Sequence, residues 1–162
     1  MDLKDLILFA VNTGLRQMEI ITLNWSMIRL EERFIMLDNR NHITKTKKVR
    51  NVPLNNAAFE ILTKRKLNCK EIGPVFTWNG IEIKQDSLIH KFIKYRIKSG
   101  INPDLTFHSL RHTFASWLIQ KGAPIYQVSK LLGHSNLATT EIYSHLRRED
   151  LLNTANMLND LD

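Results

Sequence analysis

The stretch HSLRHTF, from His108 to Phe114, is the part of the sequence that decides the fold. On an α-helix, His108, Arg111 and His112 stand at positions i, i+3 and i+4, so they share one face. The apolar residues around them fall on the other side and are predicted to pack inward: Leu110, Phe114, Trp117 and Leu118. Such a helix fits three kinds of polar face, namely a solvated surface, a zinc site or a phosphate-binding site.

The zinc alternative would use His108 and His112, because histidines at i and i+4 can chelate zinc. Two features disfavour it. The glutamate of a zinc protease helix is missing, and Arg111 would place a positive charge beside the metal cation. The single cysteine of the chain, Cys69, excludes an internal disulfide and a cysteine-clustered metal site.

The charge of the chain indicates a polyanionic partner. There are 23 Lys and Arg residues against 16 Asp and Glu, a net charge of +7, and such a balance favours nucleic acid before membrane. Residues 39–59 contain no acid and five bases: Arg40, Lys45, Lys47, Lys48 and Arg50. Residues 149–162 contain four acids and no base. This asymmetry predicts a DNA-facing body and a C-terminal segment that faces protein.

The pattern of apolar and turn-forming residues predicts one domain that is mainly α with a small antiparallel β-sheet, an α+β fold. Residues 33–54 predict short strands joined by a hairpin with Lys45 to Lys48 near its tip, and residues 73–80 an irregular or extended piece. No apolar run reaches the roughly 18 residues of a membrane span, and no secretory signal pattern is present, so we expect an intracellular protein. Helices are predicted at residues 3–11, 16–23, 56–67, 85–99, 107–121, 124–132, 137–145 and 149–160.

Three further motifs accompany the central helix. TGLRQMEI, residues 13–20, places Arg16 at the start of a short helix with Glu19 three positions on. LLGHS, residues 131–135, places His134 after a helix-ending glycine, and EIYSHL places Tyr143 nine residues later. Each alone is typical of an ordinary ion pair, helix cap or packing tyrosine. Two arginines from different segments can, however, hold phosphate oxygens bidentately, which favours the phosphate alternative for Arg16 and Arg111.

Taken in order, these motifs resemble those of the tyrosine recombinase, or phage integrase, family. The series is TGLRxxE, a basic hairpin ending in VPL, HSLRHTFAS, LLGHS and a tyrosine at a fixed offset, and it runs from about Leu6 to Leu146. The resemblance implies a catalytic domain that performs site-specific DNA recombination through a covalent 3′-phosphotyrosine intermediate, without metal or other cofactor. It implies double-stranded DNA as the partner, a synaptic tetramer of a chain that is monomeric when free, and the cytoplasm of a bacterial cell.

The resemblance also implies roles for individual residues. Tyr143 corresponds to the nucleophile, and Arg16 and Arg111 to the pair that holds the non-bridging phosphate oxygens. His108 corresponds to the residue that assists the tyrosine proton and the phosphate. His134 corresponds to a further hydrogen-bond donor to the phosphate.

Supporting roles follow in the same way. Lys45 corresponds to the hairpin lysine that protonates the leaving 5′-oxygen, with Lys47 as the second candidate because the hairpin lacks the glycine often found there. Glu19 corresponds to an acidic residue that maintains the geometry of the site, and His112 to a residue that supports the fold. The basic residues expected to contact the DNA backbone are Arg40, Lys47, Lys48 and Arg50.

The resemblance leaves several expectations to test. Members of the family carry an N-terminal DNA-binding domain, so we expect residues 1–162 to be a single catalytic domain excised from a longer protein. Residues 149–162 are predicted to form a helix that contacts a neighbouring protomer or docks on its own domain. The alternatives to a recombinase are a DNA-binding module that has lost catalysis and a type IB topoisomerase that relaxes DNA.

Overall fold

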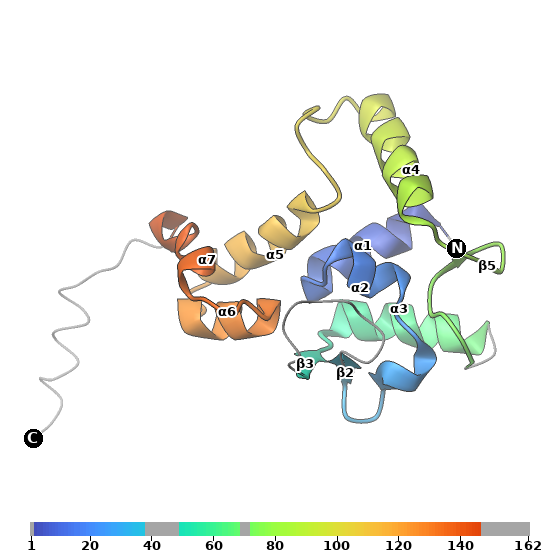
Figure 1. Cartoon of the computed structure of the whole chain (residues 1–162), viewed down its shortest axis with the longest axis horizontal. Helices are drawn as coiled ribbons and strands as arrows, with labels where there is room; N and C mark the ends of the chain where they lie inside the picture. The colour runs from blue at the N-terminus through green and yellow to red at the C-terminus, as the bar shows by residue number, and fades with distance from the viewer. Residues whose placement is uncertain (1, 38–48, 69–71, 147–162) are drawn as a thin grey trace, which may run out of the picture.

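The computed structural model describes residues 2–37, 49–68 and 72–146 of the chain, and it is mainly α with small antiparallel sheets, as predicted (Figure 1). None of the helices in these ranges is long and apolar enough to cross a membrane. The α-helices are α1 (Leu3–Thr13), α2 (Gln17–Ile21), α3 (Asn56–Leu67), α4 (Gln85–Lys98), α5 (Ser109–Gln120), α6 (Ile125–Leu132) and α7 (Ala138–Glu141). Two 3-10 helices accompany them, η1 (Trp25–Met27) and η2 (Ser144–Leu146).

The main sheet is antiparallel, in the order β1 (Ile28–Arg29), β2 (Phe34–Leu37) and β3 (Arg50–Pro53). Its inner face carries Ile35 opposite Val52, both almost fully buried. The predicted hairpin tip, Lys45 to Lys48, lies outside the described residues.

A second, two-stranded sheet was not predicted from the sequence. It pairs β4 (Thr77–Trp78) with β5 (Ile81–Glu82) around Asn79 and Gly80. Both turn residues have positive φ, 50° and 82°. Asn-Gly favours this conformation and matches the twist of a tight hairpin, so the turn converts an expected irregular piece into two short strands.

Two hydrophobic clusters make up the core. The larger one holds α1, α3 and the main sheet together, and at its centre Phe9 lies 4.9 Å from Phe76, measured between ring centroids. The smaller one joins α5, α6 and the turn before η2 through Ala115, Ile119 and Tyr143 among other residues. Helix α5 contacts both α1 and α6, and therefore lies at the junction between the clusters (Figure 1).

The close contact between α1 and α5 depends on a glycine. Gly14 ends α1 with φ of 63°, a left-handed conformation, and its N–H donates to the carbonyl of Ala10. The ring of Phe114 fills the space that a Cβ at residue 14 would occupy. Glycine is required here both by the backbone angle and by the packing.

Two predictions about the C-terminal helices were wrong. Trp117 was expected to pack inward but is 53% exposed. The buried residues of α5 are Arg111, Ala115 and Ile119, at i and i+4 spacing. Trp117 is two positions from both Ala115 and Ile119, about 200° of helix rotation, so it lies on the opposite side of the helix. The helix predicted at residues 137–145 is replaced by the short α7 and by η2. The helix predicted at 149–160 lies outside the described residues.

Candidate active site

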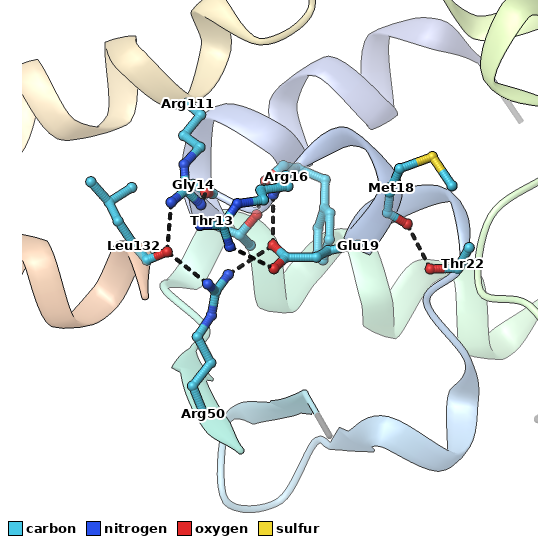
Figure 2. A network of polar contacts seen from close by, with 10 residues as sticks. Thr13, Gly14, Arg16, Met18, Glu19, Thr22, Arg50, Arg111 and Leu132 are labelled. Atoms are coloured by element: carbon cyan, nitrogen blue, oxygen red, sulfur yellow. Dashed lines mark hydrogen bonds and ion pairs between the residues drawn. The ribbon is translucent and has the colours of Figure 1, made fainter. Parts of the chain in front are cut away.

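Arg111 lies on the buried side of α5, where its guanidinium group joins the two clusters. The side chain is only 4% exposed. Its Nη1 donates to the carbonyl of Gly14 at 2.7 Å and its Nη2 to the carbonyl of Leu132 at 2.5 Å (Figure 2). These carbonyls mark the C-terminal ends of α1 and α6, where helix dipoles place partial negative charge. The group is thereby held in one orientation, with further N–H groups left for another acceptor.

Glu19 is the carboxylate around which the other arginines gather (Figure 2). Its Oε1 accepts from Nη1 of Arg16 at 3.1 Å, and its Oε2 accepts from the backbone N–H of the same residue at 2.7 Å. Nη2 of Arg50 donates to Oε2 at 2.8 Å, and Nη1 of Arg50 donates to the carbonyl of Leu132 at 2.6 Å. We call Arg16, Arg50 and Arg111 with Glu19 the arginine cluster.

The arginine cluster carries an excess of positive charge at neutral pH. Burial, together with the neighbouring Arg16 and Arg50, lowers the pKa of Arg111 to about 9, so this guanidinium remains protonated. Burial by itself would raise the pKa of Glu19, but the charge of Arg50 and the hydrogen bonds and charge of Arg16 lower it overall. Three cations therefore surround one anion, and the unbalanced charge favours binding of a further anion.

The first prediction concerns stability. Because the folded-state pKa of Glu19 lies below its ordinary value of 4.5, its ionised form stabilises the fold above that pH, and this contribution is lost as the pH falls through the lowered pKa. Glu19→Gln should lower the free energy of unfolding by about 3 kcal/mol at neutral pH, because it breaks a buried ion pair.

Urea unfolding from pH 7 to pH 3 checks this, and the difference between the wild type and Glu19→Gln should shrink below about pH 4.5. Glu60→Gln is the matched control, because Glu60 and Lys64 form an exposed pair with 3.9 Å between their charged atoms. That variant should change stability by less than about 0.5 kcal/mol. A pH-independent difference for Glu19→Gln would contradict the ionised state assigned here.

His134 follows the left-handed glycine that ends α6. Gly133 has φ of 66°, and the side chain of Arg50 fills the space where a Cβ would lie. Nδ1 of His134 is 2.8 Å from the hydroxyl of Thr140, which is fully buried. Burial, and then the charges of the three arginines, lower the pKa of His134 to about 4, so the ring is neutral at neutral pH.

Tyr143 lies beside the arginine cluster with its hydroxyl turned toward α5. The residue is 6% exposed, and its hydroxyl forms a hydrogen bond with Nδ1 of His112. The ring of His112 in turn lies edge-on to that of His108, with 5.0 Å between centroids. Burial raises the pKa of the Tyr143 hydroxyl, and the charge of Arg111 partly opposes this. Burial and the charges of His112, Arg111 and Arg16 lower the pKa of His108.

The fold thus brings together residues from distant segments that the sequence singled out. Charge interactions connect Arg111 with Tyr143 and His134, which lie on other elements, and with His108 at the start of its own helix. Lys45 and three of the expected DNA contacts, Arg40, Lys47 and Lys48, lie outside the described ranges.

Two residues make contacts that the sequence did not predict. Arg50 was expected to face DNA, but its guanidinium group is bound to Glu19 and to α6, and its side chain is 15% exposed. The alternation of β3 contained this information, because Arg50 is two residues from the buried Val52 and so shares its face. His112 was expected only to support the fold, yet it contacts the hydroxyl of Tyr143. No spacing along the chain indicated that contact.

The zinc alternative gains no support from the geometry. Within the described ranges, no three His, Cys, Asp or Glu side chains lie close enough together to hold a metal ion. The Nδ1 atom of His112 is engaged with Tyr143.

Relatives of known name share this sequence pattern. The sequence profile of the phage integrase family matches residues 1–150. A XerC-like tyrosine recombinase of Caldanaerobacter subterraneus is 33% identical over an alignment 194 residues long, and the alignment spans 98% of this chain and 49% of the relative. The chain therefore spans about half the length of the relatives it matches.

Solved structures share its fold. The catalytic domain of the bacteriophage HP1 integrase has a TM-score of 0.71 and 27% identity, and the match covers 94% of this chain and 79% of that domain. The integrase of the Tn1549 transposon, solved with circular intermediate DNA, has a TM-score of 0.74 at 23% identity, over 98% of this chain and 59% of the integrase. The chain belongs to the phage integrase family of tyrosine recombinases.

Proposed function

We propose that this chain is the catalytic domain of a site-specific recombinase that cuts and rejoins double-stranded DNA through a covalent 3′-phosphotyrosine link. One observation carries the proposal: a largely buried arginine cluster with excess positive charge lies close enough for the charge of Arg111 to act on Tyr143, whose hydroxyl is already hydrogen-bonded to a histidine. A phosphodiester anion repels nucleophiles, so attack by a hydroxyl requires such charge at the phosphate.

In this proposal the arginines bind the phosphate that is cut. Arg111 is held by two helix-end carbonyls and presents its remaining N–H groups to one non-bridging oxygen. Arg16, whose side chain is 38% exposed, reaches the other. Arg50 and Glu19 keep both groups in place. Because the donors are ordered before DNA binds, little reorganisation is needed when charge builds up on the oxygens.

The histidines and the tyrosine carry out the exchange of bonds. The oxygen of Tyr143 forms a bond to phosphorus while the bond from phosphorus to the 5′-oxygen breaks. His108, on the exposed side of α5, donates to the phosphate. His134 is neutral, and if the Thr140 hydroxyl donates to its Nδ1, its Nε2–H is free to donate to the same group. A 5′-hydroxyl from another strand then attacks the phosphotyrosine and reverses the step.

The proposal extends to the whole protein from which such a domain comes. We propose double-stranded DNA as the partner, a monomer that assembles into a tetramer on DNA, and action in the bacterial cytoplasm. Residues 149–162 are proposed to contact a neighbouring protomer in that tetramer, and Arg40, Lys47 and Lys48 to contact the DNA backbone. A topoisomerase or a silent DNA-binding module would share the fold but not strand exchange between two sites.

The test uses DNA nicked next to the cleaved phosphate, which traps the covalent intermediate because the short 5′-strand diffuses away. Incubation with the chain should give a protein–DNA adduct that survives denaturing electrophoresis and forms equally well in EDTA. Exchange of strands between two labelled duplexes then separates a recombinase from a topoisomerase, which would relax supercoiled DNA and exchange nothing. A chain that binds DNA without forming an adduct would be a binding module.

A second prediction concerns the general acid, for which Lys45 is proposed. Replacing the bridging 5′-oxygen by sulfur removes the need for a proton, because a thiol has a pKa of about 8.5 and leaves as the thiolate. Lys45→Ala should therefore cut ordinary DNA slowly and the sulfur-substituted DNA at close to the wild-type rate. Arg16→Ala is the control and should stay slow on both, since its role is at the non-bridging oxygens. Rescue of Lys47→Ala instead would move the role to that lysine.

A further inference from the structure

The hydroxyl of Tyr143 contacts His112, a histidine that takes no part in the chemical steps proposed so far. The contact joins Nδ1 of His112 to the tyrosine oxygen, and the two ring centroids are 5.9 Å apart. His112 is held on α5, where its backbone N–H bonds to the carbonyl of His108. The tyrosine is 31 residues away, after α7, and its backbone N–H bonds to the carbonyl of Thr140. Both partners are therefore fixed by their own segments.

We propose that His112 accepts the proton of Tyr143 during attack on the phosphate, an inference that rests on the function proposed above. As the bond from the tyrosine oxygen to phosphorus forms, the O–H bond breaks and the proton moves to the lone pair on Nδ1. His112 becomes an imidazolium, and the leaving 5′-oxygen takes a separate proton from the general acid. The neutral ring must carry its own proton on Nε2 before the reaction.

The position of His112 suits it to accept the proton, and the surroundings of Tyr143 make a proton acceptor necessary. A phenol loses its proton unaided only near pH 10, and burial of Tyr143 makes ionisation harder still. A general base must lie within hydrogen-bond reach of the proton, and His112 does. His112 is also an exposed residue, so water can stabilise the imidazolium that forms.

Other titratable groups share this environment. His108 lies edge-on to His112 on the same helix, and Arg111 precedes it. His134, which follows α6, is close enough for the charge of His112 to contribute to its lowered pKa. His108 is the alternative proton acceptor, so the test must separate two histidines four positions apart on one face.

The test compares His112→Asn with His108→Asn in adduct formation on nicked DNA. The asparagine amide reaches about as far as Nδ1 and can keep the hydrogen bond, but it cannot take up a proton. His112→Asn should react roughly 100-fold more slowly than the wild type at neutral pH, while its affinity for DNA and its melting temperature stay the same. Its rate should rise about tenfold per pH unit as hydroxide replaces the base, whereas the wild-type rate, which uses the built-in base, should depend on pH much less steeply.

A more acidic nucleophile distinguishes proton transfer from simple positioning. Difluorotyrosine incorporated at position 143 loses its proton more readily, so it should restore most of the activity of His112→Asn and little of that of His108→Asn. Rescue of His108→Asn alone would overturn the proposal, as would a rate for His112→Asn within threefold of the wild type or a loss that is equal at every pH. A wild type that forms no adduct would instead refute the proposed function, and this inference with it.

A measurement without substitutions covers the case in which the variants misfold. Nitrogen-15 NMR of the histidine-labelled chain reports which ring nitrogen of His112 carries the proton. A proton on Nε2 supports the proposal. A proton on Nδ1 overturns it, because that ring would donate to the tyrosine oxygen and could not accept its proton.

Discussion

Tyr143→Phe is expected to abolish the covalent protein–DNA adduct while leaving DNA binding almost unchanged. The substitution removes the attacking oxygen and nothing else, and binding depends on distributed contacts to the phosphate backbone. The fold should survive, because the ring stays in its hydrophobic cluster and the loss of one hydrogen bond to His112 costs about 1 kcal/mol. Denaturing electrophoresis of labelled nicked DNA measures the adduct, and a mobility-shift titration measures affinity.

The other tyrosines of the chain provide the controls. Tyr95 and Tyr126 are 51% and 59% exposed and belong to α4 and α6. Replacing either by phenylalanine should leave the adduct at the wild-type level. An adduct that persists in Tyr143→Phe and disappears in one of these variants would place the nucleophile elsewhere.

Arg111→Lys should reduce the rate of adduct formation roughly a thousandfold although the charge is retained. A lysine ammonium is a point charge, so it cannot donate to Gly14, to Leu132 and to a phosphate oxygen in one plane. The variant also loses hydrogen bonds that connect α1 and α6, and hydrogen bonds to charged groups contribute about 1.5–3 kcal/mol each. We therefore expect a lower melting temperature as well as slow chemistry, with DNA affinity reduced much less.

Arg16→Lys separates these two effects. Arg16 is partly exposed and its side chain binds Glu19, so the substitution should leave stability nearly unchanged. Its rate should still fall sharply, because the bidentate hold on the phosphate is lost. Stable Arg16→Lys with normal activity would mean that this arginine does not hold the phosphate bidentately. Equal losses of affinity and rate in Arg111→Lys would reduce Arg111 to an ordinary backbone contact.

Local patterns were enough to predict most of the elements. The periodicity of α1, the Asn55 cap of α3 and the glycine after α6 each depend on residues within a few positions, and the structure confirms the helices they indicated. Patterns failed where local signals were weak or shared. One helix was predicted where the structure has the two short elements α7 and η2, and the tight Asn79-Gly80 turn was not recognised as a hairpin.

The orientation of α5 could not be derived from its own sequence. Arg111 looks like a polar-face residue and Trp117 like a core residue, yet the first is buried and the second exposed. The reason is that α5 packs against α1 on one side and α6 on the other, and the helix-end carbonyls of both neighbours supply partners for a buried guanidinium. An arginine can be buried only where such acceptors are present, and they belong to residues 97 and 21 positions away.

By itself the sequence determined the fold class, the membership of the family and which arginines, histidines and tyrosine to examine, because these depend on residue type and spacing. Only the tertiary structure decided how they meet. It placed Arg50 in the arginine cluster rather than on a free surface, and it placed His112 on the hydroxyl of Tyr143. Both contacts join segments more than 30 residues apart, over which spacing along the chain carries no information about distance in space.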